Sequence, residues 1–427
     1  MTTEVVAVRA KEQLRSVEMI RRYIDVAILL TSYVLLACAF GCAKSTPKAS
    51  LPLISGSIPI SLDEKLNGSK ELLINDSGNL HVNLDSKYAF YAGIDWKYYK
   101  YPKHGLLPTT ATAMTLHNNA AAVLATQWLD SKSQATQGDL VVGTLQGQDI
   151  VFRSVKKSPD LKVIGKYIDF DRNGDERLIY FLGGQSESDS MSHIPFYYKR
   201  ITKTDKDEKT IGIPRNLLVY DPVFALDSQG FEYVFYLNFA NNSVRGDYDL
   251  YVLSVGDQRK LGRSCRHGYS LTTSADGIWA AYTDVLERKT RVLHYQKGML
   301  SEMFVVDSGA GVTGVDVAMD PDGSLWIAYL PISSDGRATN LNVANLRGET
   351  LKKYRLIENS VVGELELPRI SISKNGKTAI SAWSKGAGST LIYIYNAPND
   401  AIRGLTALES VEVKPEKTGI PAPGSKE

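Results

Sequence analysis

The stretch VDVAMDPDGSLWIAY, residues 315–329, decides the fold. Apolar and polar residues alternate before Asp-Pro-Asp-Gly, and a second apolar run containing a tryptophan follows. Alternation with a period of two is typical of a β-strand with one buried face, and Asp-Gly between two such runs predicts a tight hairpin, in which both central residues can take positive φ. The pattern returns at residues 370–383 (ISISKNGKTAISAW), which indicates a repeat.

The repeat extends along most of the chain. Its turn residues, with the clearest copies first, are Gly323, Gly376, Gly277, Gly230, Gly174, Asn119 and Gly78. Further strands are expected after these turns, the third of a unit at residues 250–253, 291–295, 341–344 and 391–395, and the fourth at 303–306 and 354–357. The mean interval between turns is about 50 residues. A unit of that length holds four strands, which is one blade of a β-propeller.

The sequence therefore predicts an all-β fold, a β-propeller of seven four-stranded blades at residues 63–412. Six or eight blades also remain open because the copies nearest the N-terminus match poorly, and a pair of β-sandwich domains is the competing architecture. Residues 44–62 are expected to form a linker whose apolar part, 51–62, supplies a closing strand for the last blade. No window after residue 50 keeps an apolar period of 3.6, so long helices are not expected.

Three polar segments interrupt or follow the repeat. Residues 185–193 are rich in serine, and residues 199–209 carry eight charges. Both are predicted to be solvated loops between strands. Residues 413–427, with several Pro and Gly, are predicted to be a disordered tail.

Residues 1–43 are predicted to be an N-terminal extension with a signal peptide or membrane anchor. Residues 23–43 carry Asp25 as their only charge and follow Arg21 and Arg22. An apolar run of this length can span a bilayer, and a positive region before it is typical of an export signal. The segment Leu-Leu-Ala-Cys ending at Cys38 resembles the lipobox of bacterial lipoproteins, which implies cleavage before Cys38 and lipid attachment to it. Cys42 is the poorer alternative, and an uncleaved anchor stays open.

Each of these interpretations places the rest of the chain in a bacterial cell envelope, tethered to the membrane and facing the periplasm or the cell exterior. Three cysteines exclude a disulfide framework. Forty-nine Lys and Arg residues against 47 Asp and Glu residues leave a net charge of +2, so nucleic acid is not an expected partner. We expect a monomer.

The repeat also resembles a known family of blades. The runs DPDGSLWIAY at residues 320–329 and PRISISKNG at 368–376 are similar to the repeats of bacterial sialidase-like (BNR-type) propellers. The resemblance covers residues 215–400 and implies the fold. Sialidase Asp boxes read Ser-x-Asp-x-Gly-x-x-Trp, whereas Pro321 stands here in the place of the Asp, and no arginine context for holding a carboxylate is found. Sialidase activity is therefore not implied.

The segment DFDRNGDE, residues 169–176, contains the sharpest local motif. Oxygen ligands at alternating positions around a glycine are how D-x-D-x-N-G loops bind calcium. The ligands would be Asp169, Asp171, Asn173 and Asp175. The segment resembles the calcium loops of integrin-type (FG-GAP) propellers, but Arg177 and Tyr180 replace the later ligands. The two interpretations are a weak calcium site and an ordinary acidic turn, and no other cofactor is expected.

No motif for catalysis stands out. The six histidines lack zinc-site spacing, and neither a G-x-S-x-G elbow nor a Walker loop is present. We therefore predict a non-enzymatic binding module for a protein or glycan ligand. The alternative is a carbohydrate-active enzyme, a glycoside hydrolase or polysaccharide lyase, with its site at the propeller axis and His267 and Tyr269 as a conceivable acid and base. His, Tyr, Arg and carboxylates at the axial mouth would favour the enzyme, and an apolar or merely polar mouth would favour the binding module.

Overall fold

The computed structural model divides the chain into two units, residues 1–50 and residues 51–427. The structure describes residues 59–66, 71–84, 87–101, 103–104, 107–117, 120–128, 138–146, 149–157, 162–170, 174–183, 196–201, 208–211, 219–238, 248–254, 257–264, 268–308, 312–333, 336–357 and 363–415, all in the second unit. In this part of the chain no helix combines the length and the apolar character that a membrane span requires. The predicted leader, with Cys38, lies outside the described residues.

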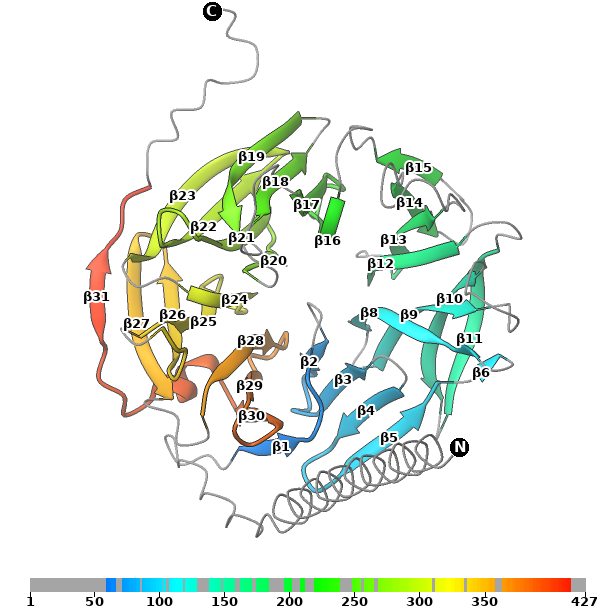
Figure 1. The fold of residues 1–427 in the computed structure, drawn as a ribbon, viewed down its shortest axis with the longest axis horizontal. Helices are drawn as coiled ribbons and strands as arrows, with labels where there is room; N and C mark the ends of the chain where they lie inside the picture. Colours follow the sequence, from blue (N-terminus) through cyan, green and yellow to red (C-terminus); the bar gives the residue numbers. More distant parts are fainter. Residues whose placement is uncertain are drawn as a thin grey trace, which may run out of the picture. The chain divides into compact units, whose positions relative to one another are not determined.

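Seven four-stranded antiparallel sheets make up the second unit (Figure 1). The first three contain β2 (Leu72–Ile74), β3 (Leu80–Leu84), β4 (Lys87–Tyr91) and β5 (Trp96–Lys100); β8 (Thr110–His117), β9 (Ala120–Trp128), β10 (Gly138–Gln146) and β11 (Asp149–Lys156); and β12 (Lys162–Phe170), β13 (Glu176–Gly183), β14 (Phe196–Ile201) and β15 (Glu208–Ile211). A single parallel pair, Gly138 with Lys162, joins the second and third into one eight-stranded sheet.

The remaining four sheets follow in the same order. They contain β16 (Val219–Leu226), β17 (Glu232–Asn238), β18 (Tyr248–Ser254) and β19 (Asp257–Ser264); β20 (Tyr269–Thr273), β21 (Ile278–Asp284), β22 (Lys289–Gln296) and β23 (Met299–Ser308); β24 (Val312–Met319), β25 (Leu325–Pro331), β26 (Leu341–Arg347) and β27 (Thr350–Ile357); and β28 (Leu365–Ile372), β29 (Thr378–Ser384), β30 (Ser389–Tyr395) and β1 (Ile60–Leu62). The helix in the described residues is one 3₁₀ turn, Pro398–Ile402. A small hairpin of β6 (Lys103–His104) and β7 (Leu107–Pro108) stands apart from these sheets.

The predicted repeat is confirmed by the position of its turns. Each of the seven turn residues lies between the first and the second strand of one sheet, although Asn119 itself is outside the described residues. The predicted third strands fall within β18, β22, β26 and β30, and the predicted fourth strands within β23 and β27. The sequence period therefore gave the four-stranded unit correctly.

The conformation of these turns differs from the prediction. In four of them a glycine takes positive φ and donates its N–H to the carbonyl three residues earlier. The pairs are Gly78 with Asn75, Gly230 with Asp227, Gly323 with Asp320, and Gly376 with Ser373. Positive φ among the described non-glycine residues occurs at Arg288, Lys297 and Leu367 alone, so the residue before each glycine does not share it. This is the geometry of a type I turn followed by a left-handed glycine, and a turn with two positive-φ residues was the wrong expectation.

Apolar side chains bind the sheets to one another. The described residues form seven hydrophobic clusters, and two neighbouring sheets contribute to each cluster. One cluster joins the first sheet to the last, with Leu72 and Leu80 against Ala379 and Ile392. Every sheet is thus buried on both faces, which a pair of two-layered sandwiches does not do.

Three segments at the ends of the sheets test or add to the predictions made from the sequence. Within the expected closing stretch, β1 pairs antiparallel with β30, and Leu62 of β1 is fully buried. The prediction of a loop at residues 199–209 is wrong at both ends, because β14 includes residues 199–201 and β15 includes 208 and 209. An unpredicted strand, β31 (Glu409–Glu412), adds to β27 as a fifth strand.

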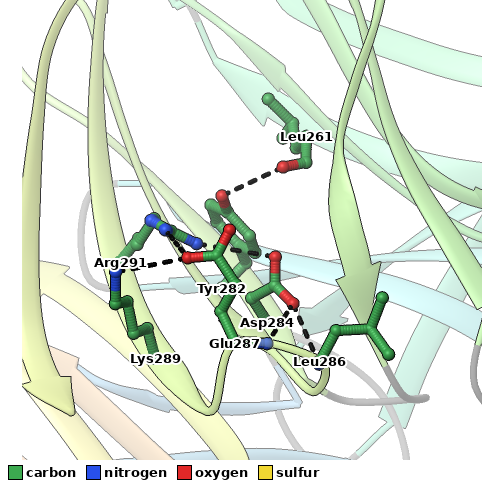
Figure 2. A network of polar contacts seen from close by, with 7 residues as sticks. All are labelled: Leu261, Tyr282, Asp284, Leu286, Glu287, Lys289 and Arg291. Carbon is green, nitrogen blue, oxygen red and sulfur yellow. Dashed lines mark hydrogen bonds and ion pairs between the residues drawn. The ribbon is translucent and has the colours of Figure 1, made fainter. Parts of the chain in front are cut away.

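A buried ion pair holds the turn between β21 and β22 (Figure 2). Asp284 accepts hydrogen bonds from the backbone N–H groups of Leu286 and Glu287, at 3.0 and 3.1 Å. Its other oxygen lies 3.5 Å from Nη1 of Arg291, a side chain that is 8% exposed. Arg291 also pairs with Glu287. Lys289 Nζ lies 3.2 Å from Glu287 Oε2, so two basic and two acidic side chains balance within the hairpin and their role is structural.

Candidate functional site

A cavity of about 950 Å³ lies among the first strands of the sheets. Its lining comes from β2, β8, β20, β24 and β28 and the turns after β2, β20, β24 and β28, together with Asp169 of β12 (Figure 1). The lining residues are 72–76, 114–116, 169, 271–275, 316–321 and 370–374. We call this space the axial cavity.

Edge backbone forms much of the axial cavity. Residues 72–76, 271–275 and 370–374 line it consecutively, whereas side chains of a strand alternate between two faces. Consecutive lining is possible because β2, β20 and β28 are edge strands, each paired on one side only. The other edge of each strand leaves backbone N–H and C=O groups outside the sheet ladder, and side chains satisfy some of them. Ser371 Oγ accepts from the N–H of Ile74 at 3.1 Å, and Asp316 accepts from the N–H of Ile370 at 2.8 Å.

Asp316 is the most buried carboxylate of the lining, with 7% of the residue exposed. It accepts hydrogen bonds from the Ser270 hydroxyl and from the backbone N–H of Ile370, the latter at 2.8 Å. Burial raises the pKa of its carboxyl, although the buried Arg369 and these hydrogen bonds act in the opposite direction. The side chain therefore joins β20, β24 and β28.

The turns at the mouth of the cavity use their polar side chains to hold their own backbone. Asp320 accepts from the N–H of Ser324 at 2.8 Å and from Trp326 Nε1 at 2.9 Å. Asp76 accepts from the N–H of Asn375 at 2.9 Å and so connects the first and last sheets. Both carboxylates are occupied by structural hydrogen bonds.

Asp169 is the residue of the predicted calcium motif that lines the cavity. Its carboxylate pairs with Arg177 Nη2 at 2.6 Å and accepts from the Tyr167 hydroxyl at 3.0 Å and the Phe170 N–H at 2.7 Å. Asp171 and Asn173 lie outside the described residues, whereas Asp175 is described and partly exposed. Among the described residues, no group of three His, Cys, Asp or Glu side chains could hold a metal ion. Calcium binding by this segment stays a prediction.

The ionisable side chains of the described lining are four carboxylates and one lysine, Lys374. Asp76, Asp169, Asp316 and Asp320 each accept structural hydrogen bonds, and the described lining contains no His, Tyr or Arg side chain. General acid and base catalysis needs a titratable group free to reach the substrate. Tyr269, one half of the conceivable pair, is buried, and His267 is outside the described residues.

No protein-family model matches the chain, and no curated protein matches it. Solved structures similar to it include a chain of the mitotic checkpoint complex, with 10% identity, a TM-score of 0.46, and coverage of 83% of this chain and 95% of that one. The Trypanosoma rangeli sialidase has 8% identity and a TM-score of 0.40 over 82% of this chain and 60% of that one. The polysaccharide lyase Uly1 has 10% identity and a TM-score of 0.40, with 68% and 77% covered. Similarities this remote do not indicate an activity.

Proposed function

We propose that residues 63–412, together with the strand β1, form a closed seven-bladed β-propeller that acts as a non-enzymatic binding module, with the axial cavity as its ligand site. The seven clusters between neighbouring sheets support the blade number, and the cluster between the first and last sheets supports closure. Pairing of β1 with β30 supplies the same closure by backbone hydrogen bonds.

The observation that carries this proposal is the occupied state of the cavity carboxylates. A hydrolase or lyase on this axis would need a free acid and a free base, whereas the Asp side chains of the described lining already hold the turns and strands together, which leaves Lys374 as its one further ionisable group. The strand edges that line the cavity, together with partly exposed side chains such as Thr272 and Met319, suit a ligand held by hydrogen bonds and apolar contact. The ligand we propose is a protein segment or a glycan.

A cavity-filling variant tests the site. The full chain in detergent is screened against peptide and glycan arrays, and the best ligand is titrated against wild type, Thr272→Trp and the control Leu286→Trp, whose leucine is 64% exposed and outside the cavity lining. We expect Thr272→Trp to weaken binding by at least about tenfold, the control to bind as wild type, and the ligand to be recovered unchanged. Cleavage of the ligand would favour the carbohydrate-active enzyme, and undiminished binding by Thr272→Trp would move the site elsewhere.

We further propose that the module is tethered to the membrane of a bacterial cell envelope and faces the periplasm or exterior, by a lipid on Cys38. The support is the apolar stretch at residues 23–43 and the lipobox-like segment Leu-Leu-Ala-Cys that ends at Cys38. Metabolic labelling with a fatty acid, followed by mass measurement of the mature N-terminus, tests this in wild type, Cys38→Ser and Cys42→Ser. We expect wild type and Cys42→Ser to carry the fatty-acid label and Cys38→Ser to lack it. Loss of the label in Cys42→Ser, or an unlabelled wild type, would contradict the proposal.

A further inference from the structure

A second, smaller pocket lies between the β20–β23 sheet and the β24–β27 sheet. Its volume is about 350 Å³, and it shares no lining residue with the axial cavity. The two sites nevertheless use neighbouring parts of the same turns, because Asp276 and Gly323 line the small pocket while Ala275 and Pro321 line the axial cavity. We call this second site the side pocket.

The wall of the side pocket is aromatic. The rings of Trp279 and His294 stack with centroids 4.1 Å apart and an interplanar angle of 8°. Phe304 lies nearly parallel to Trp279, with centroids 6.3 Å apart. Leu325 and Leu346, both buried, also belong to the lining. The wall thus combines stacked aromatic rings with an apolar base.

His294 is 3% exposed, and its Nε2 is buried without a hydrogen-bond partner. Asp276 Oδ2 lies 3.6 Å from that nitrogen, and Glu302 Oε2 lies 3.6 Å from Nδ1. Burial lowers the pKa of His294, although the two carboxylates act in the opposite direction, so the ring is neutral near pH 7. The histidine therefore leaves the negative charge of its neighbours uncompensated.

Three carboxylates, those of Asp276, Glu302 and Glu349, surround the aromatic wall, and no Lys or Arg is among the described lining residues. The side chains of Asp276 and Glu302 are 59% and 43% exposed, so both reach solvent at the opening. An aromatic face next to carboxylates attracts a cation by both its quadrupole and their charge, whereas an anion would be repelled. A neutral sugar would use the ring without needing the charges.

We propose that the side pocket binds an organic cation, an alkylammonium or guanidinium group, beside Trp279 and between the carboxylates of Asp276, Glu302 and Glu349. The volume fits one such group with the side chain that carries it. This inference is independent of the proposed role of the axial cavity, because the two linings share no residue.

Four probes test whether the side pocket binds an organic cation, and whether that cation comes from a protein side chain or from a small free amine. The full chain is titrated by calorimetry with Nα-acetyl-arginine amide, its neutral isostere Nα-acetyl-citrulline amide, tetramethylammonium and methyl glucoside. We expect the arginine derivative to bind at least about tenfold more tightly than the citrulline derivative. A preference for the arginine derivative over tetramethylammonium would point to a protein side chain as the source, and the reverse to a small free amine. Equal binding of arginine and citrulline derivatives, or binding of methyl glucoside alone, would overturn the proposal.

Charge-removing variants locate the binding. The double variant Glu302→Gln with Glu349→Gln changes partly exposed side chains. We expect it to weaken binding of the arginine derivative by at least about fivefold. The control Asp149→Asn removes a negative charge from an exposed side chain on β11, outside the side pocket, and should leave binding unchanged. Trp279→Leu should weaken binding further, with its folding checked by thermal melting. If the glutamine pair and the control bind alike, the cation is not held at this pocket, whatever ligand the axial cavity accepts.

Discussion

Asp316 Oδ2 accepts the backbone N–H of Ile370 at 2.8 Å, so one side chain of β24 satisfies an amide of β28. The other oxygen accepts the hydroxyl of Ser270 on β20. Three consecutive sheets thus meet at a single buried carboxylate beside the axial cavity. A buried acceptor with two donors is costly to remove, because both donors then lose their partner.

We expect Asp316→Ala to lower the free energy of unfolding by about 3 kcal/mol, since it orphans two donors and removes the negative charge near the buried Arg369. Ser270→Ala should cost about 1 kcal/mol, because one hydrogen bond is lost and the carboxylate keeps the other. Urea unfolding of the three proteins measures both. Equal stability of Asp316→Ala and wild type would show that the carboxylate does not join the strands.

The turn before Trp326 offers two aspartates for comparison. Asp320 accepts hydrogen bonds from the Ser324 N–H and the indole N–H of Trp326, whereas Asp322 is exposed in the same turn. Asp320→Ala should destabilise the protein by about 2 kcal/mol, and Asp322→Ala should stay within about 0.5 kcal/mol of wild type. Thermal melting of the two variants measures the difference in stability. Similar melting temperatures would contradict the structural role given to Asp320.

The period and the turns could be predicted from sequence because their signal is local. A glycine with positive φ closes several of these hairpins, among them those at Gly78, Gly230, Gly323 and Gly376. The strands β14 and β15 were missed because a run of charged residues is compatible with a strand as well as with a loop.

The candidate sites carried no such local signal. Asp316 occupies an ordinary polar position of an alternating strand, and its partners Ser270 and Ile370 are 46 and 54 residues away. The side pocket likewise combines Asp276 with Glu349 across two sheets. Only the stacking of the repeats brings these residues together, and the sequence period does not specify which side chains then meet.

Gly262 is required by the ion pair of Figure 2. A Cβ at this position would lie 2.3 Å from Oδ2 of Asp284, the oxygen that faces Arg291. Gly262→Ala should therefore cost about 2 kcal/mol. In an Asp284→Ala background the same change should cost much less, because the clashing atom is gone and the next contact, Tyr282 Cε2, is at 3.6 Å. A double-mutant cycle by urea unfolding measures the coupling, and additive effects would exclude the clash.

The pairing of β1 with β30 leads to a prediction at two adjacent residues. Leu62 is 0% exposed and belongs to the hydrophobic cluster between the first and last sheets, whereas Ser61 is exposed. Leu62→Asp should destabilise the fold by more than about 3 kcal/mol, and Ser61→Asp by less than about 0.5 kcal/mol. Limited proteolysis and thermal melting compare them. Comparable stability of the two variants would mean that β1 does not close the last sheet.

His81 gives the stability a pH dependence. It is 2% exposed, contacts the Tyr88 hydroxyl through Nδ1 and the Asn75 amide through Nε2, and burial lowers its pKa from 6.5 to about 4. Between these values the unfolded chain binds the proton and the folded chain does not, so the free energy of unfolding rises with pH across the window and is constant above it.

The slope expected from His81 is about 1.4 kcal/mol per pH unit between pH 4 and pH 6.5, or about 3 kcal/mol in total. Urea unfolding of wild type and His81→Gln at pH 4.5, 5.5 and 7.5 measures it. The glutamine can still hydrogen bond to Tyr88 or Asn75 but does not titrate, so the variant should lose this part of the slope and differ least from wild type at the lowest pH. An identical pH dependence in both proteins would show that His81 takes up its proton in the folded state as readily as in the unfolded chain.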